Sequence, residues 1–362
     1  MPVAAAGDLR RHKAYLHGPP SRYGTRSRGC AQFSRRVRDV HPAGVVLHHR
    51  PHSTDGRWSS RPLVPRPGGD RRSPPERYRP RVLPIPSVSI CLPVYDGEQF
   101  LAETIRSVLD QTYRDFEVVV LDNASTDQSG NIARSFGDPR IRIERNRETL
   151  PQAENWNRVV ELSRAPLVKV VCADDLLHPR CLELQVAPMD ADPGLAVVAA
   201  RRHMIDEQSR VIVPRRGLSG LVGVRTGVEV ARRVVRNGSN PIGESNNVLF
   251  RRDDFFTVGG WKTDRPYIMD LDLWLRLLQL GDFLGLPETL AAFRIGRGTV
   301  SSNNEEKIYE QQRMLIEELG DSPYFQVRGL DLAVGRMLAP AGRARRRALY
   351  TISKVASRGD AA

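Results

Sequence analysis

The stretch "VSICLPVYDGEQFLAETIRSVLDQTYRDFEVVVLD", residues 88–122, predicts a strand, a helix and a second strand in succession. Residues 88–94 are a short β-rich run, and apolar residues recur at helical spacing through 98–111. The run 116–122 is continuous in valine and leucine, as in a strand that is covered on both faces. Strands that alternate with helices in this way form a mostly parallel sheet.

The same alternation continues along the chain. Strands are predicted at 141–145, 167–173, 195–206 and 287–295 and within 245–255, and helices at 152–165, 226–236 and 269–281. Ser125 and Gln128 have the spacing of a capping box, which predicts that a further helix begins at Ser125. The fold predicted is α/β, with a doubly wound sheet over 87–302 and a helical C-terminal extension over 303–362.

Residues 1–86 have a different composition. They contain 18 basic and 5 acidic residues, which account for the whole net charge of +13, and 13 of the 26 prolines. Such a segment cannot bury enough apolar surface to order itself, so a disordered tail is predicted. We interpret it as a spacer or as a stretch translated from a start codon placed too early, in preference to an arm that binds RNA or anionic lipid. No nucleic-acid partner is expected.

The cysteines indicate a reducing compartment, and the hydropathy predicts no membrane-spanning helix. The four cysteines show neither CxxC pairing nor metal-ligand spacing, and Cys91 and Cys172 are predicted to be small buried hydrophobes. The sequence contains no run of about 18 apolar residues, which is the length a membrane-spanning helix needs. A cytoplasmic location is expected, and the basic stretch 342–350 would allow peripheral contact with the inner face of the membrane.

Acidic residues stand where three predicted strands end: Asp96, Asp122, and the pair Asp174 and Asp175. Doubly wound sheets bind ligands at this edge. Adjacent carboxylates repel each other, and Mg²⁺ or Mn²⁺ would relieve that repulsion while holding phosphate oxygens. The alternative is structural, with one aspartate of the pair capping a helix that begins at Leu176.

Two further positions have both structural and functional interpretations. Asp270, at the start of the amphipathic helix 269–281, either stabilises the positive end of that helix or faces a cleft as a general base. Tyr95 either belongs to an ordinary turn or stacks on a nucleobase. Neither GxGxxG nor GxxxxGK[ST] is present, which disfavours dinucleotide oxidoreductases and P-loop enzymes.

Taken together, these segments resemble the family 2 inverting glycosyltransferases with the GT-A fold, over about residues 87–300. The resemblance depends on residues 88–127, on "NWNRVVELSRAPLVKVVCADDLLHP" at 155–179 and on "GGWKTDRPYIMDLDLWLRL" at 259–277. It implies the following roles: Pro93 and Tyr95 line the base pocket, Asp122 binds the base, Asn157 and Asp174 bind the nucleotide sugar, Asp174 and Asp175 hold Mn²⁺ or Mg²⁺, and Asp270 is the catalytic base.

The sequence departs from the family pattern at four places. Cys172 replaces the first aspartate of the Asp-x-Asp motif, and Met269 replaces a glutamate before the base. Asp96 stands where the family has an asparagine, and Gly296 stands where many members have a metal-contacting histidine. Asp122, Asp174 and Asp270 are all retained.

The resemblance implies an enzyme that transfers one sugar from a nucleotide-sugar donor to a hydroxyl of a glycan or lipid-linked sugar. The mechanism would be a metal-assisted single displacement, in cell-envelope glycan or exopolysaccharide synthesis. The alternative is a non-catalytic module that binds a nucleotide sugar or a partner protein. A nucleotidyltransferase ranks last, because "PVYDGEQF" lacks a basic phosphate loop. Segments 209–225 and 296–304 are candidates for a loop that covers the cleft.

Overall fold

The computed structural model describes residues 85–296 and 304–356. Most of the predicted tail, and most of the candidate covering loop at 296–304, therefore lie outside the described residues. Within residues 342–350, predicted as a basic membrane-contact stretch, the backbone is helical.

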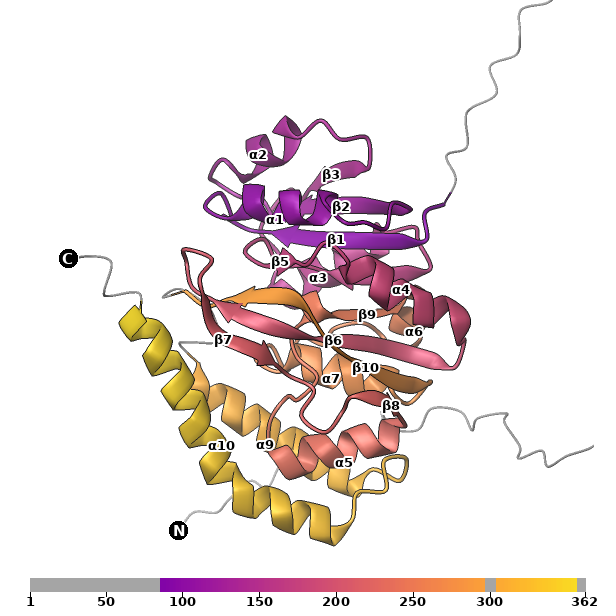
Figure 1. The fold of residues 1–362 in the computed structure, drawn as a ribbon, viewed down its shortest axis with the longest axis vertical. Coiled ribbons are helices and arrows are strands. Elements are labelled where there is room, and N and C mark those ends of the chain that lie inside the picture. The colour runs from indigo at the N-terminus through magenta and orange to yellow at the C-terminus, as the bar shows by residue number, and fades with distance from the viewer. Residues whose placement is uncertain (1–84, 297–303, 357–362) are drawn as a thin grey trace, which may run out of the picture. The chain divides into compact units, whose positions relative to one another are not determined.

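A single sheet organises the described chain (Figure 1). Its main path runs β3 (Ile141–Arg145), β2 (Phe116–Asp122), β1 (Val88–Val94), β4 (Leu167–Val170), β9 (Val248–Arg251), β6 (Leu195–Ile205), β10 (Asp282–Arg294) and β5 (Leu176–Leu177). The first four strands are parallel, whereas β9 is antiparallel to both β4 and β6. The carboxyl ends of β1, β2 and β4 therefore share one edge.

Helices cover both faces of the sheet, and each face has its own apolar core. Residues of α1 (Leu101–Leu109), α2 (Ser129–Ser135) and α4 (Cys181–Ala191) belong to one core. Residues of α3 (Gln152–Glu161), α5 (Gly227–Asn237), α6 (Arg252–Thr257) and α7 (Met269–Leu277) belong to the other. Within β1, every second residue from Val88 to Val94 belongs to the first core and Cys91 belongs to the second, as the period of a strand requires. The predicted doubly wound α/β fold is confirmed.

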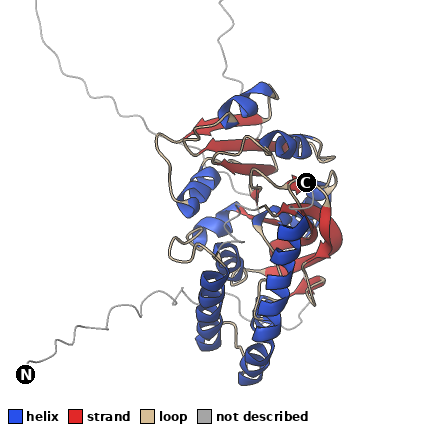
Figure 2. Cartoon of the chain, turned by 90° about the vertical axis from the view of Figure 1, so that its left-hand side faces the viewer, coloured by secondary structure: helices blue, strands red, loops and turns tan. Residues whose placement is uncertain are grey.

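The helical extension is also present. Helices α9 (Glu305–Asp321) and α10 (Gly329–Ala356) follow the sheet, and both contact α5 (Figures 1 and 2). Asp331 of α10, which is fully buried, forms an ion pair with Arg236 of α5. Among the described residues, no helix combines the length and the apolar character needed to cross a bilayer.

The predicted strands at 88–94, 116–122 and 141–145 are confirmed residue for residue, but the capping box is wrong. Helix α2 begins at Ser129, where the backbone N–H donates to Asp127. The Ser125 hydroxyl instead accepts a hydrogen bond from the backbone N–H of Asp96, 3.1 Å away. A tertiary partner in the loop after β1 thus replaces the local one.

Two other local interpretations are corrected. No helix begins at Leu176, because residues 176–177 form the short strand β5, which pairs with β10. The candidate loop 209–225 contains β7 (Val211–Arg216) and β8 (Gly223–Arg225), which pair with β6 and β10. In both places, pairing with a distant strand decides the structure.

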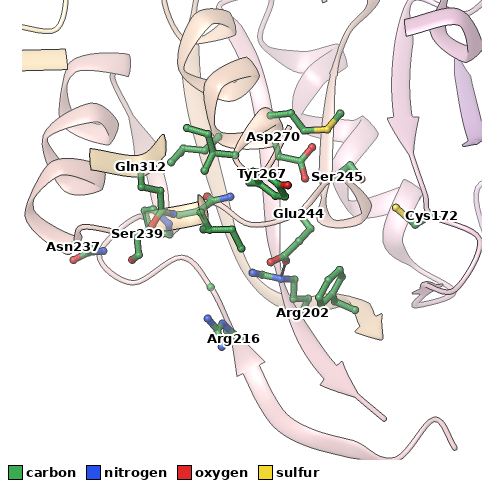
Figure 3. Close-up of a pocket in the computed structure, with 18 of the residues that line it drawn as sticks. Cys172, Arg202, Arg216, Asn237, Ser239, Glu244, Ser245, Tyr267, Asp270 and Gln312 are labelled. Atoms are coloured by element: carbon green, nitrogen blue, oxygen red, sulfur yellow. Dashed lines mark ion pairs between the residues drawn. The ribbon is translucent and has the colours of Figure 1, made fainter. Parts of the chain in front are cut away.

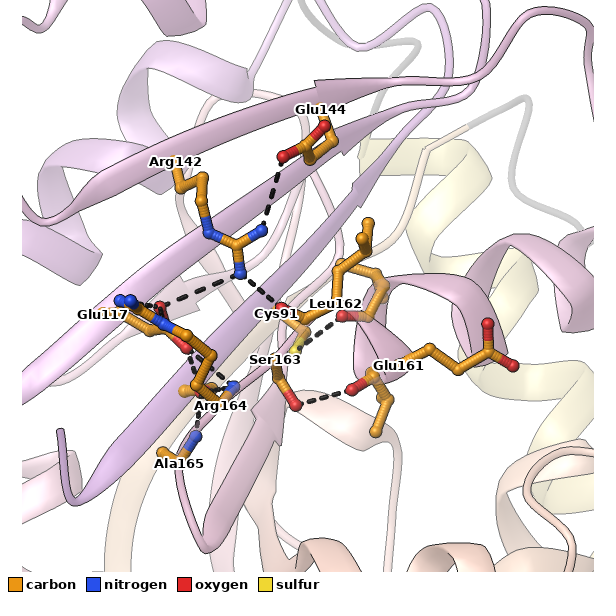
Figure 4. Close-up of polar contacts among 12 residues, drawn as sticks. Cys91, Glu117, Arg142, Glu144, Glu161, Leu162, Ser163, Arg164 and Ala165 are labelled. Carbon is orange, nitrogen blue, oxygen red and sulfur yellow. Dashed lines mark hydrogen bonds and ion pairs between the residues drawn. The ribbon is translucent and has the colours of Figure 1, made fainter. Parts of the chain in front are cut away.

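A polar cluster is buried at the amino ends of β1 and β2 (Figure 4). Glu117 is 4% exposed and accepts hydrogen bonds from the Ser89 hydroxyl at 2.7 Å and from Nε of Arg164 at 2.9 Å. Burial by itself would raise the pKa of Glu117, but these hydrogen bonds hold it below its ordinary value. The cluster fastens β1, β2 and the turn before β4 at the edge opposite the predicted ligand edge.

Candidate active site

The turn that follows β4 gathers three potential ligands. Cys172, Asp174 and Asp175 each offer one ligand atom, and these atoms lie within 4.8 Å of one another. The prediction that Cys172 is a buried hydrophobe holds only in part, because its side chain packs against the core but is partly exposed and lines a cavity. Cys91, by contrast, is buried as predicted.

The carboxylates of this cluster fit a divalent cation. Asp175 is fully buried, and its Oδ2 has no hydrogen-bond partner among the described residues. Burial raises the pKa of both Asp174 and Asp175, and the charge of Asp174 raises that of Asp175 further. The two desolvated carboxylates are oxygen donors that a cation such as Mn²⁺ would stabilise, whereas burial holds the pKa of the Cys172 thiol well above its ordinary value, which keeps that thiol neutral.

Arg294, at the end of β10, fixes the cluster in place. Its backbone N–H donates to Oδ1 of Asp175 at 3.0 Å, and its Nε donates to the carbonyl of Asp174 at 2.8 Å. Its guanidinium forms an ion pair of 2.7 Å with Glu103 and lies 4.2 Å from the ring centre of Phe100. Arg294 was not predicted as a site residue, although an arginine at the end of an apolar run was a signal.

The predicted base-binding residues lie at the ends of β1 and β2. Asp122 is 2% exposed; its Oδ1 accepts a hydrogen bond of 2.8 Å from the backbone N–H of Ser125, and its Oδ2 forms an ion pair with Arg145. Tyr95 is 56% exposed, so its ring is accessible, whereas Pro93 is buried within β1. Arg145, at the end of β3, was not predicted.

Asp270 lies in the first turn of α7 and lines a cavity of about 440 Å³ (Figure 3). The predicted base and the predicted metal cluster meet at this cavity, because Cys172 lines it too. The far wall comes from the loop that precedes β9 and from α9, through residues such as Asn240 and Gln312. The loop before β9 and the helical extension therefore shape the space beyond Asp270.

The environment of Asp270 gives it the pKa of a base that works near neutrality. Burial and the charge of Glu244 raise the pKa of Asp270 to about 7. Hydrogen bonds from the Trp261 indole and from the backbone of Ser245 limit the rise, as does Arg202, which forms an ion pair with Glu244. A carboxylate with this pKa can accept a proton in its ionised form and hold it in its neutral form.

Asn157 lies on α3, and its amide is engaged by the backbone of Trp261. Its Nδ2 donates to the carbonyl of Trp261, and its Oδ1 accepts from the N–H of Trp261, each across 2.8 Å. Asn157 is absent from the lining of the cavity that holds Asp270. Its expected contact with the nucleotide sugar stays a prediction.

Comparison with known proteins decides the family. The sequence model of "Glycosyl transferase family 2" matches residues 89–258, from β1 to the end of α6. Residues 89–258 belong to glycosyl transferase family 2. The resemblance predicted from the sequence is thereby confirmed over this segment, and the protein is a glycosyltransferase. Asp270 lies beyond the matched segment.

A relative and two solved structures agree with this assignment. The putative glycosyltransferase EpsE of Bacillus subtilis is 28% identical over 253 residues, covering 66% of this chain and 86% of EpsE. Residues 1–349 of S. aureus TarS, solved with UDP-GlcNAc, superimpose with a TM-score of 0.52 at 18% identity, covering 66% of this glycosyltransferase and 67% of that TarS chain. The mannosyltransferase PcManGT from Pyrobaculum calidifontis, solved with GDP-Man and Mn²⁺, superimposes with a TM-score of 0.52 at 17% identity, covering 76% of this chain and 80% of PcManGT. These similarities confirm the GT-A fold.

Proposed function

We propose that this glycosyltransferase transfers a single sugar from a nucleotide-sugar donor to a hydroxyl acceptor with inversion at the anomeric carbon. The observation that carries the proposal is the shared cavity of Asp270 and Cys172, with Asp174 and Asp175 beside Cys172. Inversion by single displacement needs a base on one side of the reacting carbon and a stabilised leaving group on the other.

Asp270 acts as the base in this proposal. Its carboxylate takes the proton of the acceptor hydroxyl while the acceptor oxygen forms a bond to the anomeric carbon. The bond from that carbon to the phosphate oxygen breaks, and its electron pair leaves with the nucleoside diphosphate. No protein nucleophile takes part, and holding both substrates in one cavity supplies much of the rate enhancement.

Asp174 and Asp175 are the residues that would hold a divalent cation, which would neutralise charge on the departing diphosphate. Arg294 holds the carboxylate of Asp175 through its backbone N–H and the backbone of Asp174 through its Nε. PcManGT was solved with Mn²⁺, which supports the choice of Mn²⁺ as the first cation to test.

The nucleotide would lie along the ends of β1 and β2. The exposed ring of Tyr95 offers a stacking surface, and Asp122, held by Arg145, would accept a hydrogen bond from the base. Pro93, which is buried within β1, would line the base pocket from the strand side. The solved structures carry UDP-GlcNAc in one case and GDP-Man in the other, so both donors are candidates.

The acceptor would enter beyond Asp270, where the wall includes the amides of Asn240 and Gln312 and the hydroxyl of Tyr267. Such a wall suits a polar acceptor, and a glycan or lipid-linked sugar of the cell envelope or of an exopolysaccharide is the class we propose. Helix α10 exposes Leu330 and Met337, at 69% and 72%. These side chains support a peripheral contact with the inner face of the membrane, in a cytoplasmic enzyme.

The proposal is tested with Asp270→Asn. Release of nucleoside diphosphate from UDP-GlcNAc and from GDP-mannose is measured with Mn²⁺, and donor affinity is measured by calorimetry. The variant should bind the donor normally and turn it over about 10² to 10⁴-fold more slowly, because only the base is lost. Asp264→Asn, on the same segment and 66% exposed, is the control and should match the wild type. Wild-type turnover by Asp270→Asn would remove Asp270 as the base.

A further inference from the structure

The Trp261 side chain contacts the predicted base directly. Its indole Nε1–H donates a hydrogen bond of 3.3 Å to Oδ1 of Asp270. Trp261 is 2% exposed, so solvent does not compete for this donor. A hydrogen bond to one oxygen fixes the rotation of the carboxyl group, and with it the direction of the lone pairs that receive a proton.

The position of Trp261 is fixed from several sides. Asn157, 104 residues earlier, binds both the N–H and the carbonyl of Trp261 across 2.8 Å. The indole ring packs edge-on against Trp156, with ring centres 5.2 Å apart, and against Phe255 at 5.1 Å. Two backbone hydrogen bonds and an aromatic cluster leave the indole little freedom to turn.

Gly260 is required for this arrangement. Its φ of +64° lies in the left-handed region, and a Cβ at this position would lie 2.6 Å from Oδ1 of Asn157. Any side chain there would displace the amide that holds Trp261. Asn157 on α3, the segment Gly259–Trp261 and Asp270 on α7 are therefore one connected unit.

We propose that Trp261 is a positioning residue for the catalytic base Asp270, and that Asn157 holds Trp261 in place for this task. This inference rests on the proposed function, because it needs Asp270 to act as the base. It also places Asn157 beside the catalytic base Asp270, which Asn157 influences through Trp261 and not through contact with the substrate. A donor aimed at the carboxylate favours its ionised form, so loss of that donor should make Asp270 harder to ionise.

The decisive variant is Trp261→Phe, which keeps an aromatic ring and removes the N–H. The matched control is Trp274→Phe, because the Trp274 indole is fully buried in the same core and donates 3.1 Å to the carbonyl of Gly243. Both variants should lose similar thermal stability. Only Trp261→Phe should lower kcat, by about tenfold, and move the acidic limb of the pH–rate profile up by about one pH unit, with the donor KM unchanged.

Asn157→Ala distinguishes the two roles considered for that residue. If Asn157 holds Trp261, the variant shifts the acidic limb in the same direction as Trp261→Phe, and UDP-GlcNAc and GDP-mannose bind with unchanged affinity. A weaker donor affinity with an unmoved limb would overturn this part of the inference and return Asn157 to the donor site.

A measurement on the wild-type protein removes the dependence on how well the variants fold. In ¹⁵N-labelled protein, the indole resonance of Trp261 should titrate with the same midpoint as the acidic limb, while that of Trp274 should not move. A Trp261 resonance that is insensitive to pH would overturn the inference. Asp270→Asn distinguishes failure of the proposed function from failure of the positioning role. Full turnover by Asp270→Asn would refute the proposed function. Lost turnover by Asp270→Asn, together with identical acidic limbs of the pH–rate profiles of Trp261→Phe and Trp274→Phe, would refute only the positioning role.

Discussion

Arg294 donates its backbone N–H to Oδ1 of Asp175 across 3.0 Å, although the two residues lie 119 positions apart in the chain. The same arginine donates its Nε to the carbonyl of Asp174 and its Nη1 to the carbonyl of Asp206. The arginine is 1% exposed, so water cannot replace these bonds. The proposed metal-binding residues are thus held by the last residue of β10 as well as by their own turn.

Replacing this arginine should cost stability and loosen the cluster. In Arg294→Met, the carbonyl of Asp174 loses its side-chain donor and the carbonyl of Asp206 keeps only the backbone N–H of Ser209. This loss in a buried place should destabilise the protein by about 2 to 4 kcal/mol. Thermal unfolding measures this loss. Glu103→Gln removes only the partner of the ion pair, whose side chain is 43% exposed, and should cost less than about 1 kcal/mol. Equal losses in the two variants would show that the backbone contacts contribute nothing.

Cation binding should depend on the carboxylates after β4. Asp174→Asn and Asp175→Asn should each weaken Mn²⁺ binding, in the presence of UDP, by about tenfold or more, because each removes a charged oxygen ligand. Titration followed by the electron paramagnetic resonance of free Mn²⁺ gives the affinity directly. Asp190→Asn, at an exposed position on α4, is the matched control and should bind Mn²⁺ like the wild type. Unchanged affinity in both site variants would refute the metal site.

Glu117 should make the stability depend on pH. The pKa of Glu117 is lower in the folded protein than its ordinary value of 4.5, so its contribution is present above pH 4.5 and is lost as the pH falls through the folded value. Glu117→Gln should therefore lower Tm at pH 7, by more than it does at acidic pH. Glu144→Gln, at a carboxylate that is 45% exposed, should change Tm little at either pH. A Tm difference for Glu117→Gln that is independent of pH would contradict this linkage.

Adjacent glycines should respond differently to alanine. Gly259 and Gly260 both have positive φ, +80° and +64°, so alanine strains the backbone at either position, by about 1 to 2 kcal/mol. A Cβ at Gly259 meets nothing within 4 Å, whereas one at Gly260 would lie 2.6 Å from Oδ1 of Asn157. Gly260→Ala should therefore be clearly less stable than Gly259→Ala in denaturant titrations, and equal midpoints would argue against the Asn157 contact.

The strands were predicted correctly where their signal is local. β1, β2 and β3 have the predicted bounds. β1 and β2 are buried on both faces and β3 alternates apolar with charged residues, and both patterns can be recognised without knowing the partner strand. The predicted capping box at Ser125 failed for the opposite reason. The Ser125 hydroxyl could accept from a local backbone N–H or from that of Asp96, and in the folded chain it accepts from Asp96.

The candidate site divides in the same way. Asp122, Asp174, Asp175 and Asp270 were found from their places at strand and helix ends and from the family resemblance. Arg145, Arg294 and Trp261 were not, because Arg145 and Arg294 act on partners that are distant in the sequence and the indole of Trp261 is placed by one. Trp261 and Asp270 are only nine positions apart, yet their contact depends on Asn157, which lies 104 positions before Trp261 in the sequence.

The sequence by itself determined the α/β class, the edge of the sheet where the acids gather and the family, because periodicity and short motifs are properties of consecutive residues. Only the tertiary structure decided which groups hold those acids: an arginine from the last strand, an indole from the loop before α7 and an amide from α3. Hydrogen bonds form between atoms that meet in space, and the long-range pairing of strands and helices determines which atoms meet.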